Sequence, residues 1–217
     1  MAGGRDAGLF GGSFDPPHLA HRALADAALA QLELDELLWM PARRSPHKMD
    51  RDPAPDADRV AMLRALTAGE PRFAIDEREL RRAGPSFTID TLRALRAERP
   101  GTRWWLLIGQ DQYARFDTWR DWRGILALAA VAVAARDGET VRAAPALAAC
   151  AHELRIVEMP ALPHASATVR ARAAAGRDVT ALVGVPVARY IADHRLYRSD
   201  QAPAPGAGPA LRDSENN

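Results

Sequence analysis

The chain has few or none of several features that are typical of other protein classes. Cys150 is its only cysteine, so no disulfide can form within the chain, and nothing in its cysteine usage points to secretion. The first residues lack the charged-then-apolar pattern of a signal peptide. Lys48 is the only lysine, and all other basic side chains are arginines. We therefore expect a cytoplasmic protein.

The chain also lacks long apolar runs and a large net charge. The longest apolar run, residues 125–135, is bounded by Arg123 and Arg136 and is too short to span a bilayer. With 29 basic and 28 acidic residues, the net charge is only +1, which gives no overall field to attract nucleic acid or membranes. We expect neither as a partner, and the oligomeric state stays open.

Apolar segments alternate with amphipathic segments along the chain. Because such alternation is typical of a parallel sheet with helices on both faces, the sequence predicts an α/β protein with a Rossmann-like doubly wound parallel sheet. One domain is expected over residues 1–198, with a small C-terminal helical part and a disordered tail over 199–217. The predicted strands are 7–10, 37–40, 73–75, 104–108, 131–134 and 154–157. The main predicted helices are 19–32, 58–66, 89–97, 168–175 and 187–194.

Residues 11–21, with the sequence GGSFDPPHLAH, lie between the first predicted strand and the first predicted helix. A strand-to-helix turn is where α/β folds bind phosphates. Gly11 and Gly12 let the backbone approach a ligand closely and adopt positive φ. Ser13 offers a hydroxyl and an N–H group to a phosphate.

Two histidines follow in the same run. Pro16 or Pro17 can start a helix, because proline suits the first helical position. His18 and His21 are then three residues apart on one face of the first turn, where the helix dipole adds positive charge. Two imidazoles and free N–H groups would form a cradle for a polyphosphate, although a glycine turn and a structural histidine are each common alone.

A second candidate phosphate site lies near the C-terminus. Ser166 and Thr168 stand at a predicted helix start, where N–H groups are open to an anion. Arg170 adds a possible bidentate phosphate contact. An ordinary helix cap followed by a solvated arginine would account for the same residues.

Both segments resemble motifs of the nucleotidylyltransferase superfamily. Residues 11–21 resemble G-G-[ST]-F-D-P-x-H-x-G-H, with Ala20 in place of the second-last glycine, so we expect weakened nucleotide binding. Residues 166–170 resemble I-S-x-T-x-[IV]-R, a motif near the C-terminus of that superfamily: Ser166 and Thr168 fit its left half, and its right half, which ends at Arg170, is one residue short. That deletion leaves Arg172 as an alternative to Arg170. His164, just before this motif, receives no role.

Four further segments resemble the bacterial nicotinate-nucleotide adenylyltransferases. Residues 41–48 resemble P-x-x-x-P-P-H-[KR], 85–92 resemble P-S-[YF]-T-x-x-T-L, 107–119 resemble I-I-G-x-D…W, and 190–197 resemble Y-I-x-x-x-x-L-Y. The resemblance covers about residues 7 to 198. It implies transfer of AMP from ATP to nicotinate mononucleotide in NAD biosynthesis, giving nicotinate adenine dinucleotide and pyrophosphate. Mg²⁺ would arrive with ATP, and no dedicated metal site is expected.

Residue chemistry in these segments suits a pyridine nucleotide. Trp119 can stack on a flat ring, although it could equally be a core residue like Trp104, Trp105 and Trp122. Thr88, at a helix start, can bind a carboxylate, which favours nicotinate over nicotinamide. Asp111 follows a strand and suits a ribose hydroxyl, or caps a helix. His47 and Lys48 can reach a phosphate, or belong to a solvated loop.

The resemblance assigns the residue roles as follows. The catalytic residues are His18, His21 and Arg170. The ATP-binding residues are Gly11, Gly12, Ser13, Phe14, His18, His21, Gly109, Asp111, Ser166, Thr168 and Arg170. The nicotinate-nucleotide-binding residues are Ser13, His47, Lys48, Thr88 and Trp119. Alternatives are a related enzyme that uses nicotinamide mononucleotide or another acceptor such as phosphopantetheine, and an inactive nucleotide-binding homologue.

Overall fold

The computed structural model describes residues 4–43, 52–136, 140–162 and 164–198. Within these residues, six strands form one sheet in the order β3-β2-β1-β4-β5-β6, and every neighbouring pair is parallel. The strands are β1 (Asp6–Gly12), β2 (Glu36–Pro41), β3 (Phe73–Ile75), β4 (Arg103–Gly109), β5 (Ala130–Arg136) and β6 (Leu154–Met159). The predicted doubly wound α/β fold is confirmed.

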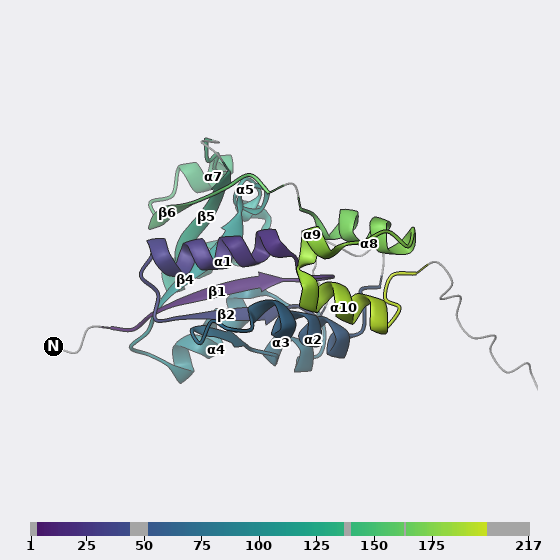
Figure 1. Cartoon of the computed structure of the whole chain (residues 1–217). Helices are drawn as coiled ribbons and strands as arrows, with labels where there is room; N and C mark the ends of the chain where they lie inside the picture. Colours follow the sequence, from purple (N-terminus) through teal and green to yellow (C-terminus); the bar gives the residue numbers. More distant parts are fainter. Residues whose placement is uncertain (1–3, 44–51, 137–139, 163, 199–217) are drawn as a thin grey trace, which may run out of the picture.

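Helices cover both faces of the sheet (Figure 1). The longer ones are α1 (Leu19–Gln31), α2 (Asp56–Thr67), α4 (Thr88–Glu98), α6 (Trp122–Leu128), α8 (Ser166–Ala174) and α10 (Val185–Asp193). The short ones are α3 (Arg78–Arg81), α5 (Gln110–Tyr113), η1 (Phe116–Thr118), α7 (Pro145–Ala148) and α9 (Thr180–Val183). No described helix is long and apolar enough to cross a membrane.

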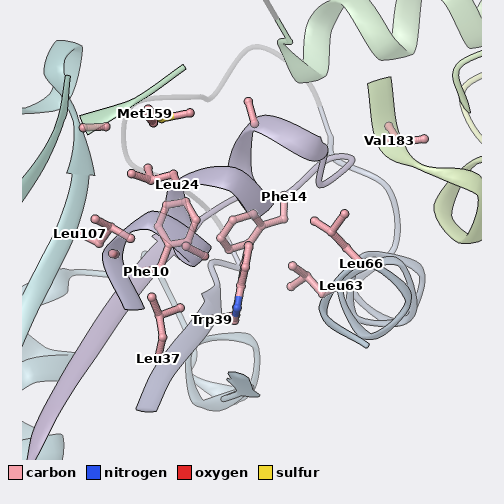
Figure 2. Packing of buried hydrophobic residues seen from close by; sticks show 14 of the residues in the cluster. Phe10, Phe14, Leu24, Leu37, Trp39, Leu63, Leu66, Leu107, Met159 and Val183 are labelled. Atoms are coloured by element: carbon pink, nitrogen blue, oxygen red, sulfur yellow. The ribbon is translucent and has the colours of Figure 1, made fainter. Parts of the chain in front are cut away.

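Two hydrophobic clusters lie on opposite faces of the sheet, because successive strand side chains point to opposite faces. On β4, Trp105 packs into the cluster under α1, α2 and α8–α10. Its neighbour Trp104 packs into the cluster under α4–α7. The aromatic centre of the first cluster is Phe10, Phe14 and Trp39, seen together in Figure 2.

The strand order reverses between β1 and β4. From β1, the chain winds outward through β2 and β3, and then returns to β4 on the other side of β1. In open α/β sheets, ligands bind outside the carboxyl ends of the strands at such a switch point. Figure 1 shows α8, α9 and α10 at the carboxyl end of β1. The fold therefore brings both motif segments to this edge.

Candidate active site

The glycine-rich turn is shaped by Phe14. Gly12 ends β1, and a Cβ on it would stand 3.0 Å from the Phe14 ring. Phe14 itself has a φ of 46° and is almost fully buried. The expectation of positive φ at Gly11 and Gly12 is wrong, because the tight turn falls on Phe14 instead. With the Phe14 ring in the core, only its backbone can face a nucleotide.

The two histidines lie against each other at the start of α1. His18 is the N-cap and His21 is the third helical residue, and their rings are stacked with centroids 3.6 Å apart. The backbone N–H of His18 donates to Nδ1 of His21 at 3.2 Å. A neutral His21 therefore carries its proton on Nε2, which makes Nε2 a hydrogen-bond donor.

The predicted helix start at residue 19 is confirmed, and neither Pro16 nor Pro17 occupies the first helical position. Helix α1 begins at Leu19, after the N-cap His18, and the Asp15–Pro16 peptide bond is cis. The two prolines therefore belong to the turn that leads into the helix. The capping position falls on a histidine, which places one of the paired imidazoles at the helix N-terminus.

The C-terminal segment docks on this turn. The Ser166 hydroxyl donates to the carbonyl oxygen of Pro16 at 2.9 Å, and Nη1 of Arg170 donates to the carbonyl oxygen of Asp15 at 2.7 Å. Ala165, not Ser166, is the N-cap of α8, so the expected capping role of Ser166 is wrong. Thr168 is exposed on the first turn of this helix.

Arg170 and Arg172 have different hydrogen-bond partners in the structure. Arg172 donates from Nε and Nη2 to the carbonyl oxygen of Asp178, at 3.0 and 2.9 Å. Gly176, with a φ of 64°, ends α8, where the N–H of Arg177 donates to the Arg172 carbonyl, a helix-end pattern that favours glycine. Arg172 thus serves the end of α8, and Arg170 reaches the glycine-rich turn.

The carboxylate of Asp15 contacts polar groups from three distant segments of the chain. Its Oδ1 accepts hydrogen bonds from the Tyr197 hydroxyl at 2.9 Å and from the Ala54 N–H at 3.1 Å. Nη1 of Arg170 lies 3.9 Å from its Oδ2. Asp15 is nearly fully buried, so these donors compensate for the loss of water.

Arg59 is a structural residue that no sequence pattern indicates. Its fully buried guanidinium donates to the carbonyl oxygens of Ser13 and Ala42, at 2.6 and 2.9 Å, and pairs with Asp56. It therefore ties the turn after β1 to the end of β2. Nothing in the sequence distinguishes it from the many surface arginines.

His164 also lies at the site, although no role was expected for it. Its ring is 6.5 Å from that of His18, centroid to centroid. Its Nε2 is 3.2 Å from the carbonyl oxygen of Ala181. Because a carbonyl only accepts, Nε2 donates and the proton of a neutral His164 is on that atom. The position of His164 two residues before Ser166 in the sequence could have indicated that it lies at the site.

The end of β4 forms the other side of the switch point. Gly109 is the N-cap of α5, and its N–H donates to Oε1 of Gln112 at 3.1 Å. Asp111 is exposed within this short helix. The capping alternative for Asp111 is therefore excluded, and its carboxylate is exposed in the helix that directly follows the carboxyl end of β4.

Thr88 and Trp119 belong to neighbouring segments on the face of the sheet that α4 and α6 cover. Thr88 is the first residue of α4, after the N-cap Phe87. Trp119 is half-buried and stacks on Phe116, with ring centroids 5.1 Å apart. Arg120 connects the two segments, because its guanidinium lies 4.6 Å from the centre of the Phe87 ring.

The remaining sequence predictions concern the core tryptophans and the loop after β2. Trp104, Trp105 and Trp122 are buried in the core, as expected. His47 and Lys48 lie outside the described residues. No group of three or more His, Cys, Asp or Glu side chains that could hold a metal ion occurs in the part of the chain that the structure describes.

Comparison with known proteins identifies relatives over nearly the whole chain. The cytidylyltransferase-like family model matches residues 9–189. The chain is 42% identical over 207 residues to a Methylibium petroleiphilum protein named "Probable nicotinate-nucleotide adenylyltransferase", covering 94% of this chain and 97% of that one. It is 44% identical over 194 residues to a protein of the same name from Albidiferax ferrireducens, covering 88% and 98%.

A solved structure shares the fold. The Plasmodium falciparum nicotinic acid mononucleotide adenylyltransferase complexed with APC superposes with a TM-score of 0.73 at 16% identity. The match covers 89% of this chain and 97% of that one.

Proposed function

This chain belongs to the cytidylyltransferase-like family, and from that premise we propose that it is a nicotinate-nucleotide adenylyltransferase. It transfers AMP from ATP to nicotinate mononucleotide and yields nicotinate adenine dinucleotide and pyrophosphate, a step of NAD biosynthesis. The relatives at 42% and 44% identity carry the name of this activity. Mg²⁺ enters in this proposal as part of the MgATP substrate, held mainly by phosphates and water.

The reaction is an in-line displacement at phosphorus. An oxygen of the nicotinate mononucleotide 5′-phosphate forms a bond to the α-phosphorus of ATP. The bond from that phosphorus to the bridging oxygen of the β-phosphate breaks, and pyrophosphate leaves with the electron pair. The attacking phosphate is already ionised near neutral pH, so no strong general base is needed. Positioning and charge stabilisation then account for catalysis.

In this proposal the paired histidines face the transferred and leaving phosphates. His21 donates from Nε2, since its Nδ1 already accepts the N–H of His18. The N-terminus of α1 adds partial positive charge, and Arg170 supplies a full one. Ser166 and Thr168 contribute from the first turn of α8, and the backbone of the glycine-rich turn lies alongside the triphosphate.

The acceptor is proposed to bind at the carboxyl ends of the strands, on the side of the sheet that α4 and α6 cover. The N-terminus of α4, beginning at Thr88, would receive the nicotinate carboxylate, and Trp119 would stack on the pyridine ring. Asp111 would bind a ribose hydroxyl. A negatively charged nicotinate suits a helix N-terminus better than a neutral nicotinamide does.

One observation carries the proposal most strongly. Ser166 and Arg170, about 150 residues from the glycine-rich turn, donate to two consecutive carbonyls of that turn. Both motifs therefore meet at the switch point beside the stacked histidines. A structural helix cap with a solvated arginine would not produce this convergence.

Pyrophosphate release from ATP and Mg²⁺ tests the proposal, with nicotinate mononucleotide and nicotinamide mononucleotide assayed side by side. We expect strong release with the acid and little with the amide. Equal release with both would overturn the carboxylate site at Thr88. Release with neither, despite ATP binding, would indicate another acceptor or an inactive homologue.

A further inference from the structure

We infer that Glu79 is a positioning residue for the acceptor nucleotide: its carboxylate holds the start of α4, where Thr88 lies, in place against the end of β2. The inference rests on the proposed function, because it concerns the same acceptor site. Glu79 itself lies beneath that site in α3 and is not expected to touch substrate.

Two buried hydroxyls meet at the Glu79 carboxylate. The Thr91 hydroxyl donates to Oε1 of Glu79 at 2.6 Å, and the Ser86 side chain lies close enough to the same carboxylate to lower its pKa. Thr91 is fully buried, and Glu79 and Ser86 are nearly so. Hydrogen bonds to an ionised acceptor in such surroundings are stronger than those between neutral groups.

Each hydroxyl in turn accepts from an arginine residue. Nη1 of Arg82 donates to Oγ1 of Thr91 at 3.2 Å, and the backbone N–H of Arg43 donates to Oγ of Ser86 at 3.3 Å. A hydroxyl has one hydrogen, and Thr91 gives its hydrogen to Glu79. Two chains of polar groups, one through Thr91 and one through Ser86, therefore meet at one carboxylate.

The two chains of polar groups contact the chain on both sides of Thr88, the first residue of α4. Ser86 immediately precedes the N-cap Phe87, and Thr91 lies in the first turn of α4. Arg43 follows the end of β2 and also donates from Nη1 to the Arg82 carbonyl oxygen at 3.4 Å. A shift at Glu79 would thus move the N–H groups around Thr88 relative to the sheet edge.

A purely structural role would not need a carboxylate here. Burial raises the pKa of Glu79, and this effect exceeds the lowering by Thr91, Ser86 and the nearby charge of Arg82. The ionised form is therefore disfavoured in the fold compared with water. A neutral side chain of the same shape would fill the space without this desolvation.

The test compares Glu79→Gln with the wild-type enzyme in steady-state kinetics. The amide keeps the shape but cannot accept hydrogen bonds with the strength of an anion. We expect KM for nicotinate mononucleotide to rise roughly tenfold or more, as small misplacements at a site can cause, while KM for ATP stays unchanged. Glu77→Gln is the matched control, because Glu77 is two residues away and pairs with Arg64 on the surface.

Several outcomes would overturn the inference. Unchanged KM for nicotinate mononucleotide in Glu79→Gln would do so, and so would an equal loss in Glu77→Gln. A lower kcat with both KM values unchanged would indicate only a loss of folded enzyme. Ser86→Ala removes one chain of polar groups and leaves the other, so it should raise the same KM less than Glu79→Gln does. A wild-type enzyme inactive with nicotinate mononucleotide would overturn the proposed function itself.

Discussion

The hydroxyl of Tyr197 donates a 2.9 Å hydrogen bond to Oδ1 of Asp15, joining residues 182 positions apart. Asp15 belongs to the glycine-rich turn, and Tyr197 follows the last described helix, α10. The same turn receives Ser166 and Arg170 from α8. The C-terminal helical part is therefore fastened to the phosphate side of the site by hydrogen bonds to one short turn.

Replacing Tyr197 with phenylalanine should loosen this attachment. We expect Tyr197→Phe to lower the free energy of unfolding by about 1–2 kcal/mol, because a buried carboxylate loses a donor, and to raise KM for ATP. Tyr190→Phe is the control, since it removes a similar 2.8 Å bond to Asp58 away from the turn. It should lower stability without changing KM. Equal kinetic effects in the two variants would contradict a specific role for Tyr197.

The imidazole of His18 should be essential for turnover. His18→Asn removes the imidazole but keeps a side chain that caps helices well, so α1 should still form. We expect kcat to fall about 10²–10³-fold, as when one stabilising donor is lost from an active site, with an unchanged circular dichroism spectrum. Near-normal pyrophosphate release in this variant would remove His18 from the proposed mechanism.

Arg170 and Arg172 should respond differently to the same change. Arg170→Lys loses the planar fork that can hold a phosphate and should lower kcat/KM for ATP about 10²-fold. Arg172→Lys loses two hydrogen bonds to the Asp178 carbonyl and should cost about 1 kcal/mol of stability without a kinetic change. The reverse pattern would show that Arg172 replaces Arg170 in the shortened motif.

The sequence predicted the fold and the main site segments because both depend on local patterns. Apolar runs matched all six described strands, and the glycine-histidine run marked the turn after β1. The short helices α3, α5, α7 and α9 were missed, because one turn gives too few residues for a periodic pattern. Contacts between distant segments were also missed. The burial of Arg59, the place of His164 and the partners of Glu79 depend on tertiary packing, which no local pattern records.

Ala20 departs from the motif of the resembled superfamily and can be tested by restoring glycine. Ala20 is buried in the first turn of α1, beside the histidines. Ala20→Gly should lower the free energy of unfolding by up to about 1 kcal/mol, because the methyl group of Ala20 packs in the hydrophobic core, and it should lower KM for ATP, because it restores the motif glycine. Ala23→Gly, one turn later, should lower stability alone. An unchanged KM for ATP in Ala20→Gly would show that the methyl group does not crowd the nucleotide.

Glu79 should make stability depend on pH in a direction opposite to that of an ordinary surface carboxylate. Because burial raises its pKa, the folded protein binds a proton more tightly than the unfolded chain. Its favourable contribution is complete below the unfolded value near 4.5 and is lost as pH rises through the raised pKa. We therefore expect Glu79→Gln to gain stability over wild type as pH rises from 4.5 to 8, measured by urea unfolding. A stability difference for Glu79→Gln that stays constant from pH 4.5 to 8 would contradict a buried carboxylate that ionises in the folded state.

Glu70 provides the opposite case, since Arg72 lowers its pKa to about 2. Wild type should lose stability relative to Glu70→Gln as pH falls from 4.5 toward 2.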